Sequence, residues 1–161
     1  MEKVEPQKEH RWLLKLVGEW TYESEGMGAP GEPPHKSTGS ERVRPVGELW
    51  IVGEGEMEMP GGETGTSLVT LGYDPEKKRF VGTWLGSMMA NLWIYEGALD
   101  AAEKVLTLEC DGPSFAGNGK MAKYRDAIEV KSDDDRVLTS HVLGDDGKWQ
   151  QFMTMNYRRK K

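Results

Sequence analysis

The sequence has almost no cysteine and no long apolar run, and each shortage excludes a class of protein. Cys110 is the one cysteine in 161 residues, so the chain forms no internal disulfide and needs no oxidising compartment. No apolar stretch approaches the roughly twenty residues of a membrane helix, and the N-terminus lacks the apolar core and cleavage site of a secretory signal. We therefore expect a cytoplasmic, bacterial-type protein with no membrane contact.

Positive charge is also scarce. The 21 Lys and Arg residues are outnumbered by 27 Asp and Glu residues, which gives a formal net charge of −6. Nucleic-acid binding favours a basic stripe, so we expect no nucleic-acid partner. The basic tail at residues 158–161 is interpreted as a solvated terminus. A hydrophobic content of 37% with 30% charged residues is typical of one soluble globular domain, which we expect to span residues 1–161.

Helical periodicity is confined to one short segment, residues 5–17. Its apolar residues Trp12, Leu13, Leu16 and Val17 recur at spacings of three and four, which predicts an amphipathic helix. A helix lying on a membrane surface is disfavoured because the stripe is short and flanked by acids. We expect the helix to cap one end of a β structure.

Most of the remaining chain alternates polar and apolar residues with the period of a β-strand. About ten short strands without a βαβ unit predict an antiparallel barrel or sandwich. A closed sheet has no free edges, and a barrel slightly wider than eight strands tends to enclose a ligand cavity. The expected strands cover residues 19–25, 37–46, 48–59, 65–73, 80–85, 91–99, 104–111, 120–131, 136–143 and 149–159. Residues 26–34 form a Gly/Pro loop that is long enough to act as a flap.

The centre of the chain predicts a β-meander. Asp74 and Pro75 are typical of a tight turn between two strands. In the second strand Phe80, Gly82 and Trp84 share one face, and large aromatic and sulfur-containing residues follow. We interpret this meander as the wall of a pocket.

Motifs spread over residues 11–160 resemble known families. Gly18-Glu19-Trp20 after a short helix is similar to the Gly-x-Trp opening of the calycin superfamily, which includes lipocalins and nitrobindin-like proteins, and the ending at residues 157–160 resembles the Arg that packs over that Trp. The stretch 72–75, with Phe80, Trp84 and Ser87-Met88, resembles an uncharacterised, mostly bacterial family, domain of unknown function 1579. The resemblance implies an all-β, antiparallel calycin-like β-barrel of about ten strands with a short N-terminal capping helix. It implies no activity, and Gly86 stands where an acidic or polar residue is expected.

Aromatic and methionine side chains are concentrated on the expected inner faces. Such residues suit a pocket for a hydrophobic or aromatic molecule, but they also suit an ordinary barrel core, and the sequence leaves both readings open. The set is Trp84, Met88, Met89, Trp93, Tyr95, Met153 and Met155.

A few polar residues are candidates for an anion clamp or a proton donor. Alternation lets either Tyr124 or Arg125 face inward, and we favour Tyr124 because it shares a face with apolar residues. Glu96, Arg42 and Arg44 are the other candidates. In the alternative interpretation these residues form ion pairs on the surface. An enzyme using Tyr124, Arg125 and Glu96 is the alternative function.

No metal or cofactor is expected. No two histidines have the spacing of a metal pair, Cys110 has no partner, and Glu54, Glu56 and Glu58 are read as a solvated face. His141 leaves one alternative open, because a strand histidine ligates iron in a related haem-binding group of ten-stranded barrels. That alternative is haem or nitric-oxide handling, and the competing reading is an ordinary histidine.

The main hypothesis is a barrel that binds a small hydrophobic or aromatic molecule. Homodimer formation stays open. No nucleophile, phosphate-loop or zincin motif is present, and Asp74 and Asp126 serve as general bases only if a cleft raises their pKa values. The candidate ligand-binding residues are Trp84, Met88, Trp93, Tyr95, Tyr124, Arg125, His141 and Met153.

Overall fold

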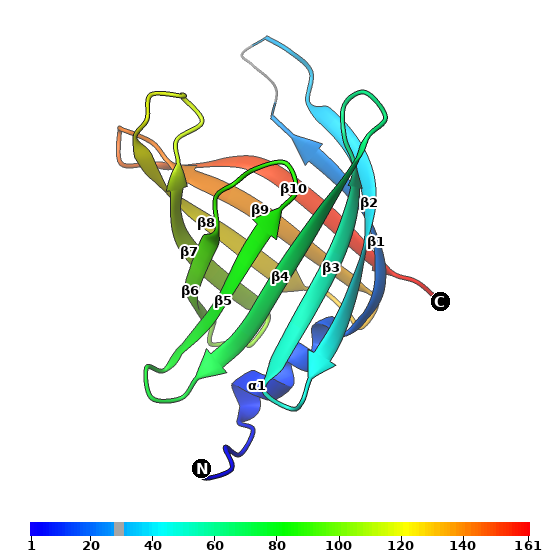
Figure 1. The fold of residues 1–161 in the computed structure, drawn as a ribbon, viewed down its shortest axis with the longest axis vertical. Helices are drawn as coiled ribbons and strands as arrows, with labels where there is room; N and C mark the ends of the chain where they lie inside the picture. Colours follow the sequence, from blue (N-terminus) through cyan, green and yellow to red (C-terminus); the bar gives the residue numbers. More distant parts are fainter. Residues whose placement is uncertain (28–30) are drawn as a thin grey trace.

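A computed structural model describes residues 1–27 and 31–161, and within these residues ten antiparallel strands form one closed barrel (Figure 1). Each strand pairs with its neighbours in the sequence, and β1 closes the cylinder by pairing with β10. The predicted all-β barrel is therefore confirmed. The strands are β1 (Gly18–Gly26), β2 (His35–Val46), β3 (Trp50–Glu58), β4 (Thr64–Asp74), β5 (Arg79–Gly86), β6 (Trp93–Leu99), β7 (Val105–Pro113), β8 (Met121–Val130), β9 (Asp135–Leu143) and β10 (Trp149–Arg159).

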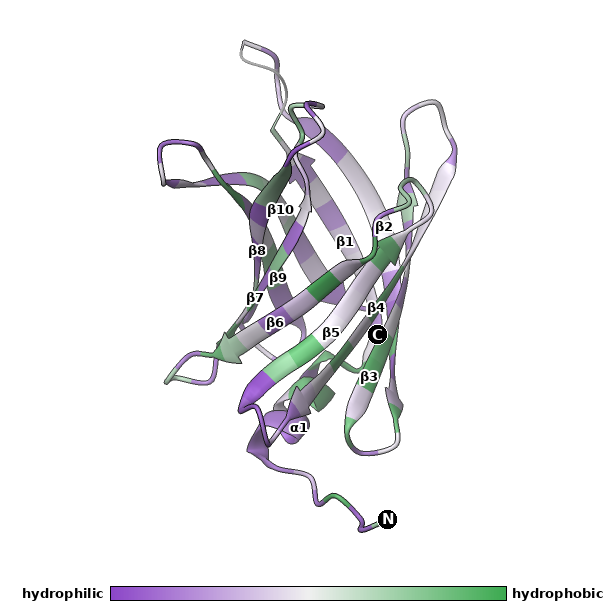
Figure 2. Cartoon of the chain, turned by 60° about the vertical axis from the view of Figure 1, so that its left-hand side comes forward, coloured by the Kyte–Doolittle hydropathy of each residue, from purple (hydrophilic) through white to green (hydrophobic). Residues whose placement is uncertain are grey.

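The period-two pattern places one face of each strand inside the barrel. In β3, Ile51 is buried while Glu54 and Glu56 are exposed, as the alternation predicts. Figure 2 shows hydrophilic and hydrophobic residues alternating along the strands. The expected strand bounds differ from the observed ones by one or two residues. Part of the loop expected at residues 26–34 lies outside the described residues, and β2 already begins at His35.

A short helix closes one end of the barrel (Figure 1). Helix α1 (Lys8–Leu13) continues into one 3₁₀ turn at Leu14–Leu16, so the helix is shorter than the expected residues 5–17. It begins late because the Gln7 backbone N–H donates to Nδ1 of His10 at 2.9 Å, which caps the first turn. Trp12, Leu13 and Leu16 are buried, which confirms the apolar stripe.

Two barrel side chains, those of Trp20 and Arg159, hold the helical segment in place. The Trp20 indole N–H donates to the Leu16 carbonyl at 2.9 Å, and the Arg159 guanidinium lies 4.2 Å above the Trp20 ring. Arg159 also donates to the Val17 carbonyl at 2.5 Å and to the Lys15 carbonyl at 3.0 Å. The expected packing of a C-terminal Arg over the Gly-x-Trp element is confirmed, and this end of the barrel is closed.

At the other end lie the hairpin loops that join β3 to β4, β5 to β6, β7 to β8 and β9 to β10 (Figure 1). Among the described residues, no helix has the length and hydropathy needed to cross a membrane.

Candidate functional site

The barrel encloses a cavity of about 340 Å³. Its lining extends from Leu16 on the capping turn to Met88 and Phe115 near the loops of the opposite end. All members of the aromatic and methionine set face this space: Trp84, Met88, Met89, Trp93, Tyr95, Met153 and Met155. The wall that the sequence predicts from the meander is therefore present, and it surrounds a hollow.

Aromatic rings crowd one side of the cavity near its loop end. The Trp93 and Tyr124 rings meet edge to face with centroids 4.9 Å apart, and Phe115 lies 5.3 Å from Tyr124 and 5.1 Å from Phe152. Phe115 is 66% exposed although it lines the cavity. The Tyr124 hydroxyl donates to the Pro113 carbonyl at 2.6 Å, which orients its ring.

The position of Phe152 departs from the predicted alternation. The sequence pattern assigns Phe152 and Met153 to opposite faces, yet both line the cavity. The pairing of β10 with β9 shifts register between Gln151 and Met153, and such a bulge turns two consecutive side chains toward the same side. The alternation alone carries no signal of this irregularity.

A half-buried carboxyl group lies on the cavity wall near the middle of β8. Asp126 in β8 accepts a hydrogen bond from the Tyr95 hydroxyl at 2.5 Å and another from the Ser140 hydroxyl at 2.6 Å. Burial raises the pKa of Asp126 above its ordinary value, and the two hydrogen bonds oppose that rise only in part. Burial next to this carboxyl also raises the pKa of Tyr95, and that of Cys110 to about 12. Asp126 therefore lies in a cleft that raises its pKa, which is the condition for a general base.

A second polar group is an ion pair inside the barrel. The Arg136 Nη2 donates to Glu41 at 2.6 Å, with side chains only 4% and 12% exposed. The Arg136 guanidinium lies 3.8 Å from the Tyr157 ring and 4.7 Å from the Trp20 ring. Sequence reasoning missed this pair, because charged residues in alternating strands are assigned to the solvent face.

Two of the predicted ligand-binding residues lie outside the cavity. Arg125 points outward, where it pairs with Glu109 at 2.6 Å and lies 4.1 Å over the Trp149 ring. His141 also faces outward, and its Nδ1 lies 3.3 Å from the Arg125 carbonyl. The strand alternation turns their neighbours Tyr124 and Ser140 inward instead. The structure brings together the other six around the cavity: Trp84, Met88, Trp93, Tyr95, Tyr124 and Met153.

The remaining polar candidates form surface ion pairs. Glu96 accepts from Arg79 at 2.7 Å, and Arg42 pairs with Glu19 at 2.9 Å. The residues suggested for an enzyme, Tyr124, Arg125 and Glu96, are therefore not assembled in one place. Among the described residues, no group of three or more His, Cys, Asp or Glu side chains is arranged to hold a metal ion.

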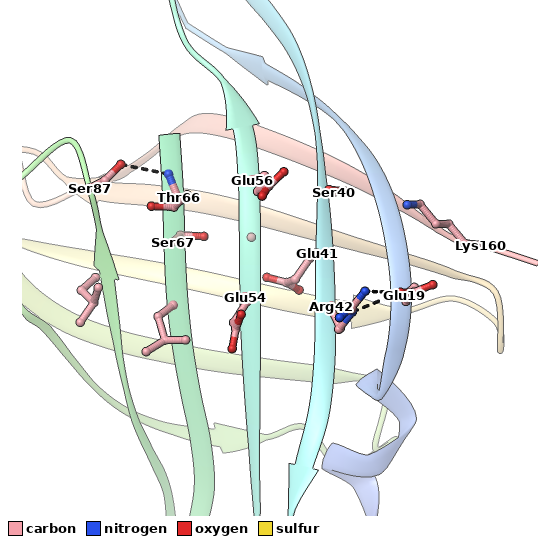
Figure 3. A pocket seen from close by; sticks show the side chains of 13 residues that line it. Glu19, Ser40, Glu41, Arg42, Glu54, Glu56, Thr66, Ser67, Ser87 and Lys160 are labelled. Carbon is pink, nitrogen blue, oxygen red and sulfur yellow. Dashed lines mark hydrogen bonds and ion pairs between the residues drawn. The ribbon is translucent and has the colours of Figure 1, made fainter. Parts of the chain in front are cut away.

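A second hollow of about 560 Å³ lies on the outer face of the sheet over β1 to β5 (Figure 3). Its exposed side chains are mostly charged, with Glu54 and Glu56 next to the Arg42–Glu19 ion pair. The predicted solvated face of β3 is therefore confirmed.

Comparison with solved structures finds the same architecture at low sequence identity. Rv2717c from M. tuberculosis is 12% identical with a TM-score of 0.65, and the match covers 98% of this chain and 100% of that one. The S-type phycobiliprotein lyase CPES from Guillardia theta is 14% identical with a TM-score of 0.64, covering 97% and 99%. The barrel EF1p2_mFAP2b bound to DFHBI is 14% identical with a TM-score of 0.50, covering 94% and 99%. At these identities the likeness shows the fold alone.

Comparison with curated proteins finds no match. A family model described as "Protein of unknown function (DUF1579)" matches residues 5–159, which is nearly the whole chain and agrees with the resemblance noted in the central meander. The chain belongs to this family of proteins of unknown function, DUF1579.

Proposed function

We propose that the protein binds a small hydrophobic or aromatic molecule inside the barrel. The observation that carries this proposal is the cavity of about 340 Å³, whose wall is largely apolar and rich in aromatic rings and methionines. Ligand pockets of roughly 300–1,000 Å³ with apolar lining and a few polar groups are typical of small-molecule sites. A filled barrel core has no comparable space, because protein interiors pack at crystal-like density.

The lining suits a flat, rigid ligand. Met88, Met89, Met153 and Met155 are flexible and polarisable, so they adjust to an irregular outline. The rings of Trp84 and the aromatic cluster offer stacking and edge contacts. Two structures with similar folds support this use of the barrel, since one is named as a phycobiliprotein lyase and the other is bound to DFHBI.

Titration with N-phenyl-1-naphthylamine tests the proposal, because this neutral probe fluoresces in apolar surroundings. We expect saturable enhancement with a micromolar dissociation constant, and competition by at least one class among fatty acids, flavins, haem and phenolic compounds. A flat titration with the probe and with all competitors would refute the proposal.

A pair of variants shows where the probe binds. Ser24 lines the cavity, whereas Glu23 on the same strand is exposed. Ser24→Phe fills part of the space and is expected to weaken probe binding about tenfold or more, while Glu23→Phe leaves binding unchanged. Equal effects of the two substitutions would place the probe outside the barrel.

A further inference from the structure

The charged side chains inside the barrel differ in whether they have a partner of opposite charge. Three of them line the cavity within the described residues: Glu41, Asp126 and Arg136. Glu41 and Arg136 neutralise each other at 2.6 Å, and the Trp20 and Tyr157 rings lie against the guanidinium. The Arg136 Nε is buried and has no hydrogen-bond partner among the described residues. Among the described residues of the cavity wall, Asp126 is the one carboxyl group without a cationic partner.

Asp126 retains unused hydrogen-bonding capacity. An ionised carboxylate offers about four acceptor sites, and the Tyr95 and Ser140 hydroxyls occupy one on each oxygen. The side chain is part of the cavity lining. Ser140 is the direct cross-strand neighbour of Asp126 in β9, so the two hydroxyls hold the carboxyl group at a fixed place. A ligand group with N–H donors would find free acceptor sites there.

The surroundings of Asp126 also favour positive charge. Trp93 and Tyr95 in β6 line the same space, and the faces of aromatic rings carry partial negative charge that attracts organic cations. Of the described residues around the cavity, Arg136 is the only cationic one, and its charge is already paired. An anionic ligand would meet Asp126 without a free cation to balance it.

We propose that the cavity selects aromatic molecules that carry a protonated nitrogen, with Asp126 as the partner of that ammonium group. This inference rests on the proposed function and names its ligand class. The aromatic part lies among the rings and methionines near the loop end, and the ammonium group reaches down to the carboxylate. An amine bound in this way gains a charge-assisted hydrogen bond in a site of low polarity.

Binding of such a cation is coupled to a proton. The groups that face Asp126 are Tyr95 from β6, Cys110 from β7 and Ser140 from β9, with His141 behind the wall and Tyr157 farther away on β10. Burial raises the pKa of Asp126, so its protonated fraction is larger than that of an exposed aspartate. An ammonium ion stabilises the carboxylate form, and the carboxyl proton leaves to solvent as the cation binds. Affinity therefore rises with pH until Asp126 is fully ionised.

Three naphthalene probes that differ only in their polar group test the inference by isothermal titration calorimetry. 2-(Aminomethyl)naphthalene is a cation, 2-naphthalenemethanol is neutral and 2-naphthoate is an anion. At about pH 8 we expect the ammonium probe to bind at least about tenfold more tightly than the naphthoate. Its affinity is expected to fall toward acid pH, while that of the alcohol stays constant.

A matched pair of variants assigns the effect to one carboxyl group. Asp126→Asn removes the charge and keeps the shape of the side chain, with its oxygen accepting from one hydroxyl and its NH2 donating to the other. It is expected to weaken the ammonium probe about tenfold and to leave the alcohol within about twofold. Glu129→Gln removes the same charge from the exposed face of β8 and is expected to change neither.

The outcomes separate the two proposals. Similar affinities for all three probes, or an ammonium preference that survives in Asp126→Asn, overturn the inference and leave the proposed function standing. A preference for naphthoate also overturns it and identifies Arg136 as the anchor. If none of the three probes nor N-phenyl-1-naphthylamine binds, both proposals fail.

Discussion

Removal of the Trp20 side chain is expected to be among the most destabilising single changes in the chain. The indole is 1% exposed and donates to the Leu16 carbonyl at 2.9 Å, and the guanidinium groups of Arg159 and Arg136 lie 4.2 Å and 4.7 Å from its ring. Burying about 250 Å² at about 25 cal/mol per Å² sets an upper limit of about 6 kcal/mol. Measured truncations of buried Trp and Phe to Ala cost about 3–5 kcal/mol. We expect Trp20→Ala to fall at the upper end of this range, because the Leu16 carbonyl also loses its donor and the capping helix loses an anchor.

Urea denaturation followed by far-ultraviolet circular dichroism measures the free energy of unfolding. Trp20→Phe keeps an aromatic ring and removes the N–H, so a loss of about 1–2 kcal/mol is expected. Trp50→Ala is the control, since Trp50 is 43% exposed on the outer face of β3, and it should cost less than about 1.5 kcal/mol. If Trp20→Ala costs no more than Trp50→Ala, the locking role of Trp20 is wrong.

Three further expectations follow from the interior and the rim. Glu41→Gln leaves Arg136 buried and unpaired, so it should lower the free energy of unfolding in urea by about 3–5 kcal/mol. The control Glu109→Gln breaks an exposed ion pair and should lower it by less than about 1 kcal/mol. Equal losses would contradict the importance of burial. The pKa of Asp126 is raised in the folded protein, so the contribution of this carboxyl group to the free energy of unfolding depends on pH. The contribution is full below the ordinary pKa of 3.8. It is lost as pH rises through the raised pKa, by at most about 1.4 kcal/mol per pH unit. Asp126→Asn should thus gain stability relative to the parent protein as pH rises, and a difference independent of pH would refute this. Phe115→Ala should weaken N-phenyl-1-naphthylamine binding without changing urea stability, because Phe115 is 66% exposed; unchanged binding would exclude Phe115 from the ligand contacts.

The strands were predictable because most of their inward positions are apolar. In β3 and β7 the inner faces carry Ile51, Leu106 and Leu108, which are all buried, and most of the alternating residues are polar. Period-two patterning then fixes both the element and the face that it buries. The Gly-x-Trp element was equally informative, because Trp20 and Arg159 form a contact that depends on only two side chains.

The polar centre was not predictable by the same rule. Glu41 and Arg136 are separated by 95 positions and meet only when the cylinder closes, so no local pattern shows that each neutralises the other. A charged residue on an alternating strand is normally assigned to water, because burying an isolated charge is costly. The inward position of Phe152 was not predicted for a different reason. The β10 bulge interrupts the alternation from which inward and outward faces are assigned.

The glycines of the barrel explain why its interior is hollow although it carries so many large side chains. A Cβ atom on Gly39 would lie 2.3 Å from the Tyr22 ring, and one on Gly112 would lie 2.0 Å from the Trp93 ring. Each ring therefore packs directly against the backbone of the neighbouring strand, at a place that a residue with a side chain would occupy. Both rings line the cavity, and packing against the strand keeps them at its wall. The same sequence choice that weakens a strand by inserting glycine thus creates the space and the aromatic surface on which the proposed ligand binding depends.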